Sequence, residues 1–226
     1  MTRDGTPEMA PDRLVAAAAD SPDPTGLTDL EARLRPVPLA PAGPPDLAGP
    51  ASAEGVLDVA FATTDSPLGR LVLAATNAGL VTCSFGGDES ALAERLARAL
   101  SPRVLRAPRL LDPARRELDA YFEGRLREFS LRVDLALTTP FGRTVLDRLR
   151  RVPYGATTTY GRLAAEIGKP GAARAVGNAL NTNPVAVVVP CHRVIGANGT
   201  LTGYAGGLPA KRLLLDLEAR GAWTRA

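Results

Sequence analysis

The pattern of hydrophobic and polar positions changes near residue 54. From Val56 onward, short apolar runs alternate with polar positions between turn residues, which is typical of β-strands. The pattern predicts strands over four segments: Val56–Ala60, Arg70–Ala75, Leu80–Phe85 and Phe129–Val133. Helical spacing of leucines and aromatic residues predicts two helices, one over Glu89–Leu100 and one from Pro113 to Gly124. Residues 54–137 are therefore expected to form a small α/β domain.

The pattern of residues 138–226 is that of short helices. They are expected over four segments: Phe141–Arg151, Tyr160–Ile167, Ala172–Asn181 and Pro209 to Gly221. Thr139 is the expected N-cap of the first, and Thr158 or Thr159 that of the second. The middle two are joined by a glycine-containing turn, as in a helix-turn-helix, although any two short helices in a small domain give this pattern. A hairpin turn over Gly196–Gly199 would supply the wing of a winged-helix module.

Residues 1–53 have a different composition. They hold ten of the twenty prolines, no aromatic residue and no periodic apolar pattern. Such a segment cannot bury enough surface to offset the entropy of the chain. It is expected to be a disordered tail, with room for a short helix over Leu27–Leu34, and no chemistry is assigned to it.

Candidate chemistry is concentrated in the stretch VAVVVPCHRVI, Val185–Ile195. Its β-branched run predicts a buried strand that ends at Pro190, followed at once by Cys191 and by His192, the only histidine of the chain. A thiol beside the side chain that moves protons near neutral pH indicates a reactive site. The alternative is that Cys191 is a small core residue and His192 an ordinary polar one.

Charge and cysteine content narrow the partners. Residues 138–226 carry twelve lysines and arginines against four aspartates and glutamates, a net charge of +8, which favours a polyanionic partner. The segment Ala172–Asn181 has small residues and Arg174 as its one charge, which suits a helix that approaches nucleic-acid bases. Cys83 and Cys191 lie too far apart in sequence for a disulfide framework or a metal-ligand spacing, so neither metal nor cofactor is expected. The absence of a long apolar run and of a secretory signal favours a cytoplasmic protein without a membrane span.

Six short motifs in order resemble the C-terminal domain of the O6-alkylguanine-DNA alkyltransferase family. They are VPYG (Val152–Gly155), TTYGRLA (Thr158–Ala164), AARAVGNAL (Ala172–Leu180), NPV (Asn183–Val185), PCHRVI (Pro190–Ile195) and GYAGGL (Gly203–Leu208). The preceding region is loosely similar to the ribonuclease-H-like N-terminal domain of that family. The resemblance implies an α/β protein with that domain at residues 54–137 and a winged-helix-like domain with a helix-turn-helix at residues 138–226.

The resemblance also implies a reaction. Cys191 would attack the alkyl group of O6-alkylguanine, and of O4-alkylthymine, in double-stranded DNA and keep that group, so that each molecule acts once as a monomer without a cofactor. The thiol proton would leave through a bridging water to His192, which Glu218 orients. A water bridge suits the expected strand, because neighbouring residues on a strand point to opposite faces.

Further roles follow from the same resemblance, residue by residue. Tyr160 would donate its hydroxyl to the guanine, and Asn183 would tie the recognition helix to the active-site segment. Arg174 would fill the place of the flipped nucleotide, with Ala173 close to the DNA. Three residues would line the base pocket: Val194, Tyr204 and Ala205. Some family members have serine where Ala205 stands, and a hydroxyl contact would be lost here.

Two alternatives come from other classes. A winged-helix regulator, or a protein that only recognises the lesion, would not need the acceptor thiol, yet Cys191 stands beside His192 with Glu218 downstream. A cysteine hydrolase usually takes its base from a histidine distant in sequence, and the chain has no second histidine. The sequence leaves open which alkyl groups are accepted and whether double- or single-stranded DNA is preferred.

Overall fold

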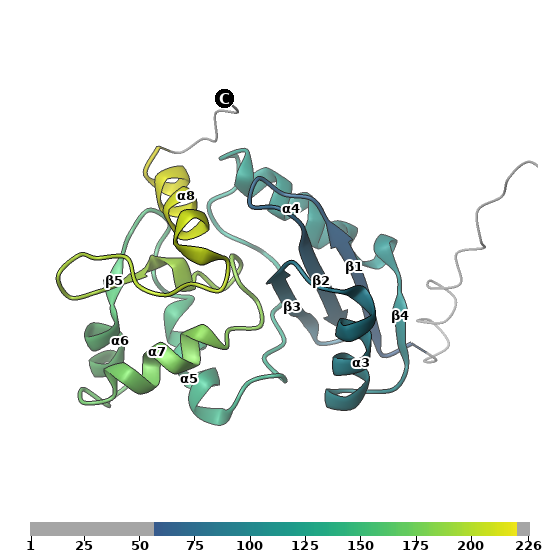
Figure 1. Ribbon diagram of the computed structural model, residues 1–226, viewed down its shortest axis with the longest axis horizontal. Helices are drawn as coiled ribbons and strands as arrows, with labels where there is room; N and C mark the ends of the chain where they lie inside the picture. Colours follow the sequence, from purple (N-terminus) through teal and green to yellow (C-terminus); the bar gives the residue numbers. More distant parts are fainter. Residues whose placement is uncertain (1–56, 221–226) are drawn as a thin grey trace, which may run out of the picture. The chain divides into compact units, whose positions relative to one another are not determined.

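The computed structural model describes residues 57–220. The first part of the described chain forms a sheet of four strands: β1 (Val59–Thr64), β2 (Leu71–Thr76), β3 (Gly79–Phe85) and β4 (Val104–Arg106). The order is β3-β2-β1-β4, with β2 antiparallel to both neighbours and β4 parallel to β1 (Figure 1). The expected disordered tail of residues 1–53 and the helix over Leu27–Leu34 lie outside the described residues.

Helices α3 (Glu89–Ala99) and α4 (Asp112–Phe122) cover opposite faces of this sheet. Successive strand residues point to opposite faces, so Val72 packs with Leu92 and Leu96 of α3, whereas Leu73 packs with Leu118 of α4. The short 3₁₀ turn η1 (Pro108–Leu111) leads into α4. The hydrophobic pattern thus located the two helices and the three long strands, although β1 begins three residues later than expected.

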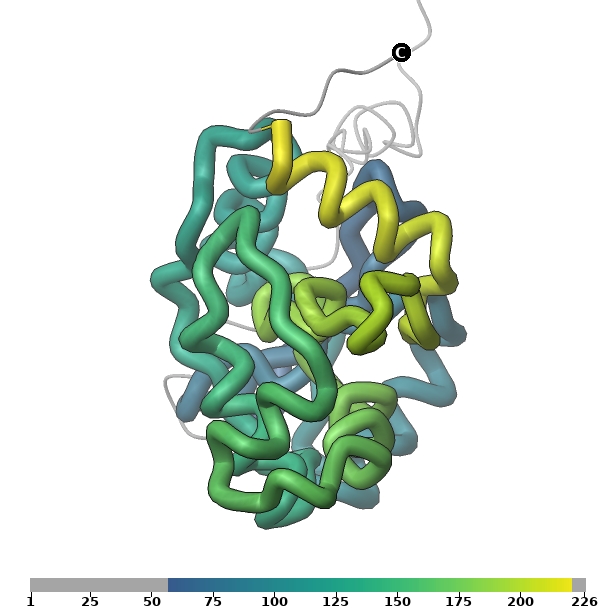
Figure 2. Tube along the Cα trace, turned by 90° about the vertical axis from the view of Figure 1, so that its left-hand side faces the viewer, coloured from purple at the N-terminus to yellow at the C-terminus, as the bar shows by residue number. Residues whose placement is uncertain are grey.

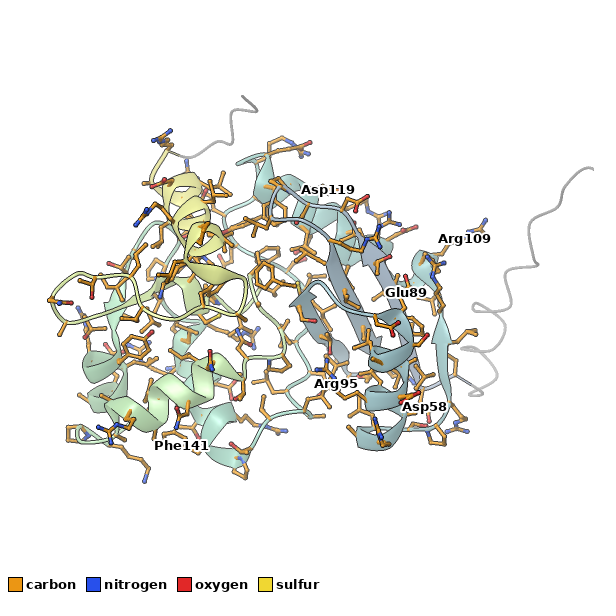
Figure 3. The ribbon with its side chains drawn as sticks, viewed as in Figure 1. Asp58, Glu89, Arg95, Arg109, Asp119 and Phe141 are labelled. Carbon is orange, nitrogen blue, oxygen red and sulfur yellow. The ribbon has the colours of Figure 1, made fainter. Side chains whose placement is uncertain are left out.

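Strand β4 was missed because it is short and largely exposed. Its three residues show no alternation of apolar and polar positions. Residues in and next to the strand form ion pairs instead. Asp58 pairs with Arg103 and Glu89 with Arg106, each at 2.9 Å, and both acidic residues are labelled in Figure 3. Pairing with β1 therefore depends on long-range contacts that local sequence does not encode.

The second part of the described chain is mainly helical. Helix α5 (Pro140–Leu149) begins after Thr139, α6 (Tyr160–Glu166) begins after Thr159, and each threonine caps its helix through its side chain. Helices α7 (Ala173–Asn181) and α8 (Gly207–Arg220) follow. A short parallel pair joins β5 (Thr158–Thr159) to β6 (Val194–Ile195). In Figure 2 the yellow α8 runs beside the 3₁₀ turn η2 (Cys191–Arg193), with which it is in contact.

The predicted valine strand is wrong. Val185 forms one bridge to Cys83 and Ala186 one to Val189, and the chain between them turns, with Val187 at a φ of 71°. The backbone N–H of Val189 donates to the carbonyl of Val185 at 2.9 Å, so the segment closes on itself rather than extending. All five residues from Val185 to Val189 are buried. A buried turn requires apolar residues as a buried strand does, so an apolar run alone does not distinguish the two.

The predicted strand over Phe129–Val133 is also absent, apart from a single bridge between Val133 and Leu80. The free edge of β3 is shared between two segments. At Leu80 it bonds residues 132 and 134, and at Cys83 it bonds Pro184 and Ala186, each bond 2.8–2.9 Å long. The segment before Cys191 is therefore anchored to the sheet edge.

The expected wing is present as a turn only. Gly196 N–H donates to the carbonyl of Thr200 at 2.8 Å, but residues 200–206 form no strand, and β6 pairs with β5. Within residues 57–220, no helix is long and apolar enough to cross a membrane.

Candidate active site

Cys191 is held by the turn that precedes it. Its side chain is buried, with a residue exposure of 7%, and it starts the 3₁₀ turn η2 rather than standing at the end of a strand. Asn183, also buried, donates from Nδ2 to Cys191 Sγ at 3.2 Å and to the carbonyl of Val189 at 2.9 Å. Its Oδ1 accepts the N–H of Val185 at 3.0 Å. One amide side chain thus fixes the turn and contacts the thiol.

His192 is fully buried and pairs with Glu218 of α8, with 2.9 Å between Nε2 and Oε1. The carboxylate can only accept, so Nε2 carries the hydrogen of a neutral ring, and Nδ1 keeps a lone pair. Nδ1 has no hydrogen-bond partner among the described residues. The imidazole therefore has a free basic nitrogen in the residue next to the thiol.

Glu218 receives several donors besides His192. Arg193 binds both carboxylate oxygens at 2.8–3.1 Å, and Gly155 N–H donates to Oε2 at 3.0 Å. Tyr121 Oη donates to Oε1 at 2.8 Å. Arg193 also donates to the carbonyl of Val152 at 2.7 Å, which connects the site to the loop after α5. A buried carboxylate is tolerated here because its oxygens are fully bonded.

Burial dominates the electrostatics of the nucleophile and the base. It raises the pKa of the Cys191 thiol, although the hydrogen bond from Asn183 and the charge of Lys211 act in the opposite direction. Burial lowers the pKa of His192 despite the attraction of Glu218, so the ring is neutral near pH 7. Burial also acts to raise the pKa of Glu218, but the hydrogen bonds and charges of His192 and Arg193 outweigh it and lower this pKa to about 2. The resting site therefore holds a thiol, a neutral imidazole and a carboxylate.

A small pocket lies in front of the thiol, with a volume of about 20 Å³. Its lining residues come from α6, α7, η2 and the loop before α8: Tyr160, Gly177, Leu180, Asn181, Cys191, Gly203, Tyr204 and Ala205. The hydroxyls of Tyr160 and Thr202 are 2.7 Å apart across this region. The volume holds about one water molecule and no purine, so a base could enter only after the loop moves.

The predicted site residues fall into three groups. Cys191 lies in contact with Asn183, and Tyr160, Tyr204 and Ala205 share its pocket. His192 and Glu218 form a pair that does not line this pocket. The remaining three lie outside the pocket lining: Val194 is buried in β6, Arg174 is exposed on α7 and Ala173 is half-buried at its start.

Residues of the site region that the sequence did not predict include Tyr121, Thr202 and Lys211. Lys211 is fully buried, and its ammonium donates to the carbonyls of Val194 at 2.6 Å and Thr202 at 3.0 Å. Lys211 precedes Glu218 by seven residues, which places both on the same face of one helix, so the sequence could have predicted that Lys211 lies near the site. Tyr121 gave none, because its contact with Glu218 joins positions 97 residues apart.

Two family models match consecutive parts of the chain. The family model "6-O-methylguanine DNA methyltransferase, ribonuclease-like domain" matches residues 59–135, and the model "6-O-methylguanine DNA methyltransferase, DNA binding domain" matches residues 140–220. Methylated-DNA--protein-cysteine methyltransferase of Mycolicibacterium paratuberculosis is 44% identical over 72% of this chain and 93% of its own. The protein of the same name from Methanosarcina acetivorans is 42% identical over 70% of this chain and 97% of its own.

A solved structure is similar as well. The crystal structure of Mycobacterium tuberculosis OGT in complex with DNA has a TM-score of 0.64 and 43% identity, and covers 72% of this chain and 94% of that one. The two family models, the two relatives and this structure all indicate the same family. The chain belongs to the 6-O-methylguanine DNA methyltransferase family.

Proposed function

We propose that the protein repairs DNA by transferring the alkyl group of O6-alkylguanine directly to the sulfur of Cys191, once per molecule. The observation that carries the choice of residues is the buried Nδ1 of His192, which has no partner among residues 57–220 and belongs to the residue next to a buried thiol that faces a pocket. The same reaction is proposed for O4-alkylthymine. The thioether product is stable, so the protein is consumed in the reaction.

The proposed chemistry is a displacement at saturated carbon. The Cys191 proton passes through one bridging water to His192 Nδ1, and the imidazolium is stabilised by Glu218. The thiolate attacks the alkyl carbon, the new S–C bond forms as the C–O bond breaks, and the electron pair stays on the guanine. Tyr160, which lines the pocket, donates a hydrogen bond from its hydroxyl to the departing base and so helps to neutralise the negative charge that develops there. The proton acceptor of the thiol and the donor to the leaving base are thus separate groups.

Access to this chemistry requires the pocket to open. Its volume of about 20 Å³ excludes a purine, and the contact between Tyr160 and Thr202 lies beside it. We propose that a flipped nucleotide displaces the loop of residues 203–205, which carries Tyr204 and Ala205. Tyr160 then exchanges Thr202 for the guanine as its partner. Val194 remains a proposed pocket residue through the backbone of β6.

Helices α6 and α7 are proposed to bind the duplex as a helix-turn-helix, with the turn at residues 196–200 as a wing. Arg174 is exposed on α7 beside Ala173, where it can occupy the position that the flipped nucleotide leaves. We assign residues 138–226 to this DNA-binding domain and residues 54–137 to the ribonuclease-like domain. One chain carries every proposed site residue, so we propose a monomer, acting in the cytoplasm, where thiols stay reduced.

The test is an incubation with a duplex oligonucleotide that carries one O6-methylguanine, followed by intact mass and peptide mapping. We expect the protein to gain the mass of one CH₂ on the peptide that contains Cys191, with one equivalent as the limit. Cys191→Ala should bind the lesion without modification. Tight binding by the unmodified wild-type protein would contradict transfer.

The DNA-binding role of α7 is tested separately from the chemistry. Arg174→Ala should slow transfer from the duplex by about tenfold or more, because the space left by the flipped base is no longer filled. Its rate with a free O6-alkylguanine base should equal that of the wild type, since Arg174 lies outside the pocket lining. An equal loss on both substrates would place Arg174 in the chemistry instead.

A further inference from the structure

Tyr121 is a residue of the sheet-covering helix α4 whose hydroxyl reaches the active site. The side chain is fully buried, and its ring lies against Phe129 and Tyr154, with ring centres 5.1 and 6.1 Å away. Oη donates to Glu218 Oε1 at 2.8 Å and lies 3.5 Å from His192 Nε2. A phenylalanine would fill the same apolar space, so packing alone does not explain the hydroxyl.

The hydroxyl is a permanent donor. Burial, followed by the charge of Glu218, raises the pKa of Tyr121 well above its usual range, so the phenol stays protonated. Glu218 Oε1 thus accepts from Tyr121, from His192 and from Arg193. A carboxylate that accepts more hydrogen bonds is a weaker base toward each donor. Tyr121 therefore competes with His192 for the negative charge on one oxygen.

This competition matters for the proton acceptor. Glu218 favours the imidazolium form, and in that form Nδ1 already carries a proton and cannot take one from the thiol. Every donor that weakens the pull of Glu218 adds to the effect of burial, which already favours the neutral ring. We infer that Tyr121 is a positioning residue through which the ribonuclease-like domain holds His192 as a neutral base with a free Nδ1. The inference rests on the proposed function.

Other charged and titratable groups also face the Glu218–His192 pair. They come from η2, from α8 and from the loops after α5 and before α8: Cys191, Arg193, Lys211, Tyr154 and Tyr204. Arg193 and Lys211 both disfavour the imidazolium by their charge. All five remain in a variant that lacks only the Tyr121 hydroxyl, so a shift in that variant reports on this one donor.

The test uses the fact that His192 is the only histidine of the chain. Protein labelled with ¹⁵N in the imidazole gives NMR signals from one residue, which report both tautomer and pKa. In the wild type we expect the neutral form with hydrogen on Nε2. In Tyr121→Phe we expect the pKa of His192 to rise by about 0.5 unit or more, about threefold in the ionisation constant. The acidic limb of the pH profile of methyl transfer should move up by the same amount.

Tyr154→Phe is the matched control, since its hydroxyl also lies near Glu218 but donates to the carbonyl of Leu217, at 3.4 Å, instead of to the carboxylate. It should leave the pKa of His192 unchanged. Tyr121→Met carries the same test if Tyr121→Phe does not fold, and failure of both to fold would make the hydroxyl a structural requirement and overturn the inference. An unchanged pKa in a folded variant, or an Nδ1–H tautomer in the wild type, would overturn it too. Wild-type protein that accepts no methyl group would instead contradict the proposed function.

Discussion

Asn183 couples the shape of the active-site turn to the acidity of the thiol. Asn183→Asp keeps the Oδ1 acceptor for Val185 but replaces the Nδ2 donor to Cys191 by a carboxylate oxygen. A negative charge beside the sulfur disfavours the thiolate, so the pKa of the thiol should rise further above its already raised value. We expect transfer at neutral pH to slow by about tenfold or more, measured as the single-turnover rate from pH 6 to 10.

Asn183→Ala is the comparison for this prediction. It removes the donor without adding a charge, so its rate should lie between those of the wild type and Asn183→Asp. It also leaves the buried N–H of Val185 unbonded, which should cost about 1–3 kcal/mol in the free energy of unfolding. Equal rates for the wild type and Asn183→Asp would show that the amide does not act on the thiol.

Glu218 makes stability depend on pH. Its pKa falls from 4.5 to about 2 in the folded protein, so its stabilisation is complete above about pH 4.5 and is lost as the pH falls toward 2. A shift of this size corresponds to about 3 kcal/mol. We expect Glu218→Gln to be less stable than the wild type by about this amount or more at pH 7, with the difference narrowing below pH 4.5. Urea unfolding from pH 3 to 7 measures it.

Glu166→Gln is the control for this prediction. Glu166 pairs with Arg148 at 2.7 Å and with Arg162 at 3.1 Å, but its side chain is 23% exposed. Water screens such pairs, so the loss should stay below about 1 kcal/mol. A loss at Glu218 no larger than that at Glu166 would mean that the buried carboxylate does not stabilise the fold.

At the scale of single elements, the N-cap of α6 positions Tyr160. Thr159 Oγ1 accepts the N–H of Arg162 at 3.2 Å, and Thr139 Oγ1 caps α5 in the same way at 3.1 Å. Thr159→Ala and Thr139→Ala should each cost about 1 kcal/mol in thermal or chemical unfolding. Only Thr159→Ala should also slow transfer from duplex DNA, because its helix begins at a pocket residue. If Thr159→Ala and Thr139→Ala transferred the methyl group at the same rate, the cap of α6 would not position Tyr160 for the reaction.

The caps of α5 and α6 show what local sequence could predict. A threonine before Pro140, and another before Tyr160, set both helix starts from residues close in the chain. The turn over Val185–Val189 could not be predicted in this way. Its conformation depends on Asn183 inside the turn and on the edge of β3, which is about 100 residues away in sequence. The apolar run correctly predicts that these residues are buried, but it wrongly predicts an extended backbone.

The same contrast applies to the site. Cys191, His192, Glu218 and Asn183 were expected together because a resemblance of ordered motifs implied them, and the structure pairs Asn183 with Cys191 and His192 with Glu218. Tyr121 and Lys211 were not expected. Both are buried polar side chains inside apolar patterns, where a tyrosine counts as a core aromatic and a lysine as a solvent-facing residue. Their partners become visible only in three dimensions.

At the scale of the described chain, residues 57–220, one hydrophobic core runs through both domains that the family models match. Leu73 of β2 and Leu146 of α5 are fully buried and belong to the same cluster. The edge of β3 and the hydroxyl of Tyr121 add polar contacts across the junction. Shared burial of this kind couples the unfolding of the two domains, because neither can open without exposing the apolar surface of the other.

We therefore expect the ribonuclease-like and DNA-binding domains to unfold in one transition. Leu73→Ala and Leu146→Ala should each lower the free energy of unfolding by about 2–5 kcal/mol, because each leaves a cavity in the common core. Calorimetry should show a single peak that moves down in both variants, and circular dichroism and loss of methyl transfer should follow the same temperature curve. Two peaks, with each substitution moving only one, would show that the domains are independent. In that case the contacts of the β3 edge and of Tyr121 would position the active site without coupling the stabilities of the two domains.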